Sequence, residues 1–369
     1  MYKVLFLIHD LGRGGAEKVL VNLVNNMDPE QFDITVMALF GGGVNEQFLK
    51  KHVKFRTAFP RMIPGNSHLM KLFSPQTLHR LLIHEHYDIE VAYLEGPSAR
   101  IISGCPEKDT KLVSWIHCTM SSPEQASLSF RSEREASRCY NSFDRLVCVA
   151  ATARDALRKA LPLTVPMDVL YNVNESDVIQ CKAEEEAQGL DAFPGTRLVC
   201  VGKLDQVKGF DRLLNVVYRL KEAGYPLQLF VLGKGNEEAK LREQAEKLAL
   251  SQTVHFLGYQ TNPYKYVAKC DLFVCSSYSE GFSTAATEAL IVGTPVCTTE
   301  VSGMREMLGE SEYGLIVDNS EEALYEGIKR LLDDPALLAH YRKQAEVRGR
   351  FFSKENTVKA VEEMLLSLS

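Results

Sequence analysis

Short apolar runs alternate with amphipathic stretches along the whole chain, and this alternation constrains the fold more than any other feature. About six runs of strand length lie in each half of the chain: Val4–Ile8, Ile34–Phe40, Ile89–Leu94, Leu112–Ile116, Leu146–Val149, Val169–Leu170, Leu198–Val201, Leu227–Leu232, Val254–Leu257, Leu272–Cys275, Pro295–Cys297 and Gly314–Val317. Stretches with helical periodicity, such as Ala16–Met27 and Asp211–Ala223, lie between them. Because such short apolar runs suit central strands of parallel sheets, the pattern predicts an α/β fold.

The length of 369 residues indicates more than one hydrophobic core. The even division of the strands predicts two doubly wound parallel-sheet domains that face each other across a cleft. Turn-forming and charged residues over Leu170–Gly195 mark the connector between them. We therefore expect an N-terminal domain over residues 1–172 and a C-terminal domain over residues 173–348.

The composition excludes several classes of protein. The net charge of −6 argues against nucleic-acid binding by the chain as a whole. The nine cysteines are scattered without C-x-x-C spacing, so we interpret them as small buried hydrophobes in a reducing cytosol rather than as disulfides or zinc ligands. No apolar run has the roughly 18 residues of a membrane span, and the run at Val4–Ile8 is too short for a signal peptide. We expect a cytoplasmic protein.

Ligands of open parallel sheets bind at the carboxyl ends of the strands, so the search for a site is restricted to residues that follow strands. The first strand leads into a loop with Gly12, Gly14 and Gly15, whose backbone N–H groups could hold an anion. A dinucleotide fingerprint fits poorly, because Glu17 replaces its third glycine. A tight turn without any ligand remains an alternative.

Polar residues also follow several later strands. His117 follows Leu112–Ile116 directly, where it would contact a polar substrate or be a satisfied loop histidine. Lys203 and Lys208 lie between Gly202 and Gly209, and two lysines in one strand-end loop suit a diphosphate, although they could equally be solvated. Two further strands end at Gly233 and Gly258, where the backbone could pass close to a flat ring.

The strongest signal follows Leu272–Cys275. Glu280 lies in the loop, and Glu288 lies on a helix that we expect to begin near Ser283. The small residues Thr284 and Ala285 leave the N-terminus of that helix uncovered, so its N–H groups can face an anion. The alternative is an amphipathic helix with one carboxylate at its rim.

Together these motifs resemble the retaining glycosyltransferases of family 4, over essentially the whole chain. The resemblance rests on the Gly14-Gly15-Ala16-Glu17 loop, on His117, on the basic pair Lys203 and Lys208, and on two glutamates, Glu280 and Glu288. It implies the GT-B architecture, in which two Rossmann-like domains face each other across a cleft. In this architecture the last helix often returns to the N-terminal domain, so we assign residues 349–369 there.

The resemblance also implies a role for each site residue. Lys203 and Lys208 would hold the donor diphosphate and stabilise the leaving group, Glu280 would bind hydroxyls of the sugar, and His117 would contact the sugar from the N-terminal domain. These four are the expected catalytic residues. The expected donor-binding residues are Gly14, Gly15, Gly202, Gly233, Gly258, Ser283, Thr284, Ala285 and Glu288, the last at the nucleotide ribose.

Three positions depart from the family pattern. Lys203 stands where the family usually has Arg, Ser283 where it often has Gly, and Val173 where its hinge usually has Gly. None of these changes removes a charge that the reaction needs. The chain has no D-x-D pair, so we expect no metal and no cofactor besides the nucleotide-sugar substrate. The resemblance favours retention through front-face attack, with the donor phosphate helping to take the acceptor proton.

A stretch without acidic residues separates Glu46 from Glu85 and combines basic with apolar side chains. This composition suits docking on an anionic membrane through residues 50–73, or equally a solvated face of the domain. We therefore expect transfer of a hexose or N-acetylhexosamine, from a UDP-sugar or alternatively a GDP-sugar, to a polyprenyl-diphosphate-linked saccharide in cell-surface glycan synthesis. The alternatives are a transferase with a soluble acceptor, a sugar-nucleotide epimerase and a non-catalytic sugar-nucleotide sensor.

Overall fold

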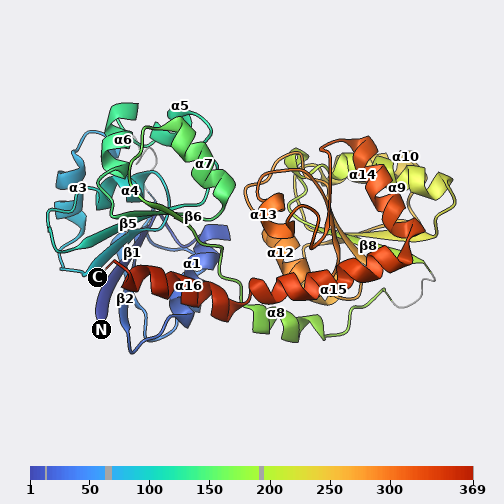
Figure 1. The fold of residues 1–369 in the computed structure, drawn as a ribbon, viewed down its shortest axis with the longest axis horizontal. Coiled ribbons are helices and arrows are strands. Elements are labelled where there is room, and N and C mark those ends of the chain that lie inside the picture. The colour runs from blue at the N-terminus through green and yellow to red at the C-terminus, as the bar shows by residue number, and fades with distance from the viewer. Residues whose placement is uncertain (13–14, 63–68, 191–194, 369) are drawn as a thin grey trace. The chain divides into compact units, whose positions relative to one another are not determined.

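The chain forms two compact units in a computed structural model that describes residues 1–12, 15–62, 69–190 and 195–368 (Figure 1). Unit 1 consists of Met1–Asn174 together with Glu355–Ser369, and unit 2 consists of Glu175–Lys354. Each unit is built around one parallel sheet. The two parallel-sheet units confirm the α/β fold expected from the strand pattern.

Unit 1 has a seven-stranded sheet in the order β3-β2-β1-β4-β5-β6-β7. Its strands are β1 (Tyr2–Ile8), β2 (Phe32–Phe40), β3 (Lys54–Phe59), β4 (Ile89–Ala92), β5 (Lys111–Ile116), β6 (Arg145–Cys148) and β7 (Met167–Val169). Its helices are α1 (Gly15–Asn26), α3 (Pro75–Leu82), α4 (Pro97–Ile102), α5 (Pro123–Ser127), α6 (Glu133–Tyr140), α7 (Ala151–Ala160) and α16 (Lys354–Leu366). The strand order reverses between β1 and β4, which places a topological switch point there.

Unit 2 has a six-stranded sheet in the order β10-β9-β8-β11-β12-β13. Its strands are β8 (Thr196–Val201), β9 (Leu227–Leu232), β10 (Val254–Gly258), β11 (Leu272–Cys275), β12 (Val296–Thr299) and β13 (Leu315–Val317). Its helices are α8 (Ser176–Ala183), α9 (Phe210–Glu222), α10 (Glu238–Lys247), α11 (Tyr264–Val267), α12 (Thr284–Ile291), α13 (Met304–Leu308), α14 (Glu321–Asp333) and α15 (Pro335–Phe351). The switch point of this sheet lies between β8 and β11.

The central strands are apolar because both of their faces are covered. In β1, Val4, Phe6 and Ile8 are fully buried and share one cluster with Leu20 and Val24 of α1. Such burial contributes about 1.5–3 kcal/mol for each large side chain, which explains why these strands carry continuous apolar runs.

The edge strand β3 is absent from the expected set, which contained six strands for this half. Among the strands that the structure describes, it pairs only with β2, and it begins with the alternating charges of Lys54 and Arg56. Lys54 pairs with Asp33 at 2.6 Å and Arg56 with Glu85 at 2.7 Å. A strand exposed at the edge of a sheet carries charge rather than an apolar run, and for that reason its sequence resembles a surface patch.

The last two helices belong to different units, whereas we expected residues 349–369 to return to unit 1 together. Helix α15 continues through Gly349 to Phe351 in unit 2, and the chain changes unit at Glu355. A side chain at position 349 would lie 2.2 Å from the Leu290 carbonyl oxygen, so this glycine permits close packing of α15 on α12. Helix α16, red in Figure 1, packs its buried Val361 into the core of unit 1. The first change of unit follows Asn174, two residues after the expected end at 172.

In the described ranges, no helix combines the length and the apolar character that crossing a bilayer requires.

Candidate active site

The loops after β8 and β11 meet at the switch point of unit 2. A short helical turn, Gln206–Lys208, follows β8, and Ser276–Ser283 follows β11. The two strands are neighbours in the sheet, so their carboxyl ends lie at one edge. Lys208, Ser277, Glu280 and Ser283 help to line one small hollow at this edge. This is the position at which open parallel sheets bind their ligands.

Lys208 and Glu280 form an ion pair across this edge. The Lys208 Nζ donates to Glu280 Oε1 at 2.6 Å, and the Ser277 hydroxyl donates to the same oxygen at 2.6 Å. The Glu280 side chain is only 9% exposed, and burying a carboxylate is costly without such partners. An ammonium group has three N–H donors, so Lys208 can keep this contact while it donates to a phosphate oxygen. The two residues to which the family resemblance assigns the diphosphate and the sugar are therefore in direct contact.

Buried Arg212 of α9 holds the loop that carries Glu280. Its guanidinium donates to the carbonyl oxygens of Ser276 at 2.7 Å and Ser277 at 2.6 Å. Gly209 adopts a left-handed conformation with φ of 62°, and a Cβ there would lie 2.1 Å from the Ser276 carbonyl oxygen. The Ser276 hydroxyl in turn donates to the Lys208 carbonyl at 3.0 Å. These contacts fix the loop after β11 against the loop after β8 before any ligand binds.

Three of the glycines expected to bind the donor lie on neighbouring strand ends. Gly202 follows β8, Gly233 follows β9 and Gly258 ends β10. A Cβ on Gly233 would lie 1.8 Å from the Gly202 carbonyl oxygen, and the Gly233 N–H donates to the Gly258 carbonyl at 2.8 Å. Packing of the strand ends against each other is thus sufficient to require glycine at 233. Lys203, in the same region, is exposed.

The first turn of α12 carries the remaining donor-binding candidates. Ser283 is the N-cap, and its hydroxyl accepts a hydrogen bond from the Ala286 N–H at 3.4 Å. This capping role explains how serine fits where the family often has glycine. Thr284 is exposed and Ala285 partly exposed, in agreement with an uncovered helix N-terminus.

Glu288, one turn further along α12, has a partner that the sequence did not indicate. The Tyr264 hydroxyl of α11 donates to Glu288 Oε1 at 3.1 Å. Burial is the main cause that raises the pKa of Tyr264, and the neighbouring Glu288 carboxylate raises it further. This hydroxyl therefore stays protonated and remains a donor. Tyr264 therefore orients the carboxylate that the family resemblance assigns to the ribose.

At the corresponding edge of unit 1, His117 follows β5 as expected. Its backbone N–H donates to Glu95 Oε2 at 2.9 Å, and its ring lies 4.9 Å from the Tyr93 ring. Burial lowers the pKa of His117 to about 4, so the imidazole is neutral near pH 7. Its Nε2 atom is buried, and none of the described residues offers it a hydrogen-bond partner. A hydroxyl group of a ligand would satisfy this atom.

The loop after β1 contains an unexpected pair of polar side chains. His9 Nδ1 lies 2.7 Å from Asp10 Oδ2, and Asp10 Oδ1 accepts from the Gly12 N–H at 2.7 Å. Neither residue is among the site residues expected from the sequence, although the position directly after a strand is the signal that could have found them. Gly14 lies outside the described residues, and Gly15 is exposed at the start of α1.

Two family models match the chain. Residues 13–173 match the model described as Glycosyltransferase Family 4, and residues 184–348 match the model described as Glycosyl transferases group 1. The chain belongs to the glycosyltransferases that these two models describe. The models meet near the observed change of unit, so each unit carries one of the two family domains.

Curated relatives of this glycosyltransferase match over most of its length. A Campylobacter jejuni protein is 28% identical over 362 residues, which are 96% of each chain; it is named N-acetylgalactosamine-N,N'-diacetylbacillosaminyl-diphospho-undecaprenol 4-alpha-N-acetylgalactosaminyltransferase. The lipopolysaccharide core biosynthesis glycosyltransferase LpsD of Rhizobium meliloti is 26% identical and covers 89% of this chain and 88% of its own.

Solved structures confirm the predicted GT-B fold of this glycosyltransferase. Anabaena Alr3699/HepE in complex with UDP superposes with a TM-score of 0.80 at 20% identity, over 99% of this chain and 100% of that one. The apo form of the lipopolysaccharide outer core galactosyltransferase WaaB gives a TM-score of 0.73 at 16% identity, over 99% of each chain. At such identities the likeness concerns the fold alone.

Proposed function

We propose that this glycosyltransferase transfers a hexose or N-acetylhexosamine from a UDP-sugar to a hydroxyl of a polyprenyl-diphosphate-linked saccharide. The transfer retains the anomeric configuration and uses neither a metal nor a cofactor. The name of the Campylobacter relative supports a diphospho-undecaprenol acceptor, and the UDP complex of the Anabaena protein supports the nucleotide. The product would enter the synthesis of a cell-surface glycan such as capsule, exopolysaccharide or lipopolysaccharide.

The Lys208–Glu280 pair carries this proposal. Negative charge grows on the leaving diphosphate during glycosyl transfer, and a preorganised cation stabilises that charge best. Lys208 is fixed at the switch point by Glu280 and has further N–H groups to donate. Exposed Lys203 adds a second positive charge after the same strand, β8. Two lysines and the N-terminus of α12 thus supply the charge that a metal would otherwise supply.

Retention through front-face attack agrees with the contacts of Glu280. Its Oε1 atom accepts hydrogen bonds from an ammonium group and from a hydroxyl group. These two donors hold the carboxylate in place, which supports a binding role for Glu280 in preference to a covalent glycosyl-enzyme intermediate. Glu280 is better suited to accept hydrogen bonds from sugar hydroxyls, while the acceptor proton passes to a phosphate oxygen of the leaving group.

The remaining candidates bind parts of the substrates. Glu288, oriented by Tyr264, would accept hydrogen bonds from the ribose hydroxyls. The buried Nε2 of His117 would hydrogen-bond a sugar hydroxyl, which would satisfy an atom that has no partner among the described residues. The first contact would position the nucleotide, and the second would position the sugar.

A surface of unit 1 suits the membrane that holds such an acceptor. Leu69, Leu72 and Phe73 are 51%, 73% and 46% exposed, and Lys71 lies among them. Buried Arg100 donates to the carbonyl oxygens of Met70 at 2.8 Å and Phe73 at 2.7 Å, which fixes this segment at the surface. Apolar side chains beside a lysine suit the interface of an anionic membrane, so we assign the protein to its cytoplasmic face.

The transfer assay combines purified protein, a panel of nucleotide sugars and a polyprenyl-diphosphate-linked saccharide. We expect one UDP-sugar to raise the melting temperature, and only that donor to support transfer. Glu280→Ala lowers turnover, whereas Glu243→Ala, at an exposed position of α10, leaves it unchanged. An inverted anomeric configuration of the product by NMR would overturn retention, and turnover that requires added Mg²⁺ or Mn²⁺ after EDTA treatment would overturn metal-independent transfer.

Membrane docking is tested separately with anionic liposomes at low salt. The double variant Leu72→Ser with Phe73→Ser should release the protein from the liposomes, whereas Val347→Ser, at an exposed position of unit 2, should not. Equal binding of both variants to the liposomes would exclude this surface as the membrane-docking site.

A further inference from the structure

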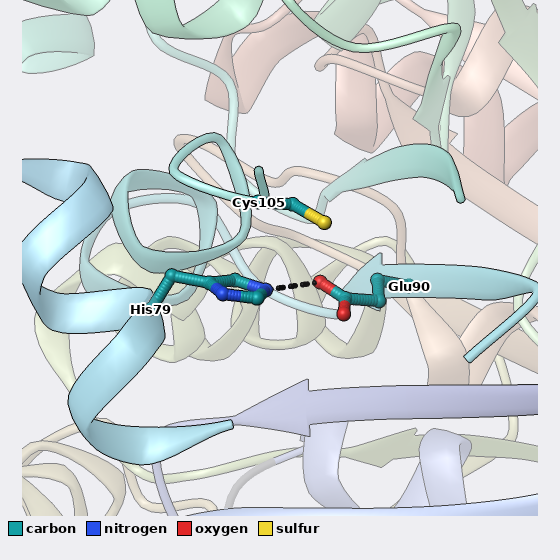
Figure 2. Close-up of side chains that lie close together, drawn as sticks. All are labelled: His79, Glu90 and Cys105. Carbon is teal, nitrogen blue, oxygen red and sulfur yellow. Dashed lines mark hydrogen bonds and ion pairs between the residues drawn. The ribbon is translucent and has the colours of Figure 1, made fainter. Parts of the chain in front are cut away.

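A cluster of polar side chains, two of them buried, lies toward the amino ends of the strands in the sheet of unit 1. Glu90 is the second residue of β4 and therefore lies near its amino end, away from the strand ends that carry His117. Helix α3 supplies His79, and Cys105 follows α4 (Figure 2). His79 is 4% exposed and Glu90 only 1%. The cluster has no role in the proposed transfer reaction.

The three side chains offer their ligand atoms to one point. His79 Nε2 lies 2.8 Å from Glu90 Oε2, and the Cys105 sulfur completes a set of ligand atoms that all lie within 4.8 Å of one another. Figure 2 shows the imidazole and the carboxylate directed at each other, with the sulfur beside the carboxylate. In the described part of the chain, this is the one group of three such residues close enough to hold a metal ion.

We propose that His79, Glu90 and Cys105 bind a thiophilic divalent cation of the Zn²⁺ class. Imidazole nitrogen, thiolate sulfur and carboxylate oxygen are the ligand types of zinc, with bonds of about 2.0–2.3 Å. The existing hydrogen bond between His79 and Glu90 aligns two of the ligand atoms, which then need only small shifts to accept an ion between them. Carboxylate Oε2 of Glu107 lies 3.2 Å from the Cys105 sulfur, so Glu107 or a water can occupy the fourth position.

Burial of charge gives a reason for a cation here. A buried carboxylate is costly unless it is paired, and the hydrogen bond from His79 is the one that the described residues give to Glu90. A divalent ion would neutralise Glu90 and the thiolate together. Coordination places the ring proton on His79 Nδ1, so that Nε2 offers its lone pair, and the Cys105 thiol releases its proton to solvent. The ion would then connect α3, β4 and the segment after α4.

The test uses the full chain, stripped with EDTA, desalted and titrated with Co²⁺ in place of Zn²⁺. We expect one equivalent to bind with a thiolate-to-cobalt charge-transfer band, and Zn²⁺ to displace it. Cys105→Ser removes the band, whereas Cys181→Ser, at an exposed position in unit 2, keeps it. Glu90→Gln should weaken binding about tenfold or more. A band that survives in Cys105→Ser, or the absence of stoichiometric binding, overturns the proposal.

A second measurement needs no variant. Zn²⁺ should protect Cys105 from alkylation in the wild-type chain, as read by peptide mass spectrometry, while exposed Cys181 stays reactive. Equal labelling of Cys105 with and without Zn²⁺ would contradict the site.

Discussion

Both sheets carry their functional candidates at the carboxyl ends of their strands. The two sites differ in whether their polar side-chain atoms already have hydrogen-bond partners. In unit 2, Glu280 accepts from Lys208 and Ser277, and Arg212 fixes the loop that carries Ser277 and Glu280. In unit 1, His117 is neutral and its buried Nε2 has no partner among the described residues. The difference indicates that unit 2 is preorganised to neutralise charge, whereas unit 1 offers hydrogen bonds that a ligand completes. This division suits the charged diphosphate of a donor at unit 2 and an uncharged hydroxyl group at His117 of unit 1.

The largest expected effect comes from removing the charge of Lys208. Lys208→Met should lower turnover by about 10²–10³, because a preorganised cation opposite the leaving group contributes that much. Lys203→Met is the matched control, since Lys203 is exposed in the same region, and should cost less. Steady-state kinetics on both variants measure the difference, and equal losses would contradict the special position of Lys208.

A double variant separates stability from catalysis at the same pair. Lys208→Met alone leaves the largely buried Glu280 carboxylate without its cation and should lower the melting temperature. Adding Glu280→Gln removes the unpaired charge and should restore the melting temperature, but not turnover. Recovery of turnover in the double variant would show that the pair only stabilises the fold.

The next effect concerns pH and belongs to unit 1. The pKa of His117 is lowered to about 4 from an ordinary value near 6.5, so below that ordinary value the unfolded chain binds a proton that the folded chain resists. The contribution of the neutral His117 imidazole to the free energy of unfolding is therefore complete above about pH 6.5, and it is lost as the pH falls toward 4. The resulting loss of folding stability between pH 7 and pH 5 is about 2 kcal/mol.

Chemical denaturation at these two pH values measures this loss. His117→Gln should reduce the loss of stability between pH 7 and pH 5, whereas His86→Gln, at an exposed position, should not. An unchanged pH dependence in His117→Gln would mean that the imidazole is not buried in its neutral form.

The strand ends and their polar residues could be predicted from sequence because both follow from local pattern. Apolar runs locate central strands, and the residues after a run lie at the carboxyl end of the strand. The positions of His117 and Glu280 after their strands could therefore be predicted without a structure. The edge strand β3 was missed because its exposed residues carry alternating charges rather than an apolar run.

Side chains that act through contacts distant in sequence could not be predicted. Arg212 holds a loop 64 residues further along the chain, and Tyr264 reaches Glu288 from another helix. The cluster at His79 and Glu90 draws its third member from a separate loop, so no spacing motif marks it. The fold brings these residues together, and local sequence patterns do not predict such long-range contacts.

The smallest expected effect tests one of these distant contacts, between Tyr264 and Glu288. Tyr264→Phe keeps the ring but removes the hydrogen bond, worth about 1 kcal/mol, so donor affinity should fall about fivefold while kcat stays nearly constant. Tyr259→Phe, at an exposed position, is the control. Titration with UDP and with the donor separates the parts of the ligand, because a carboxylate that binds the ribose affects both equally. If the variant weakened only the sugar donor and not UDP, Glu288 would serve the sugar, and the charge-binding character of unit 2 would rest on Lys208 and Glu280 alone.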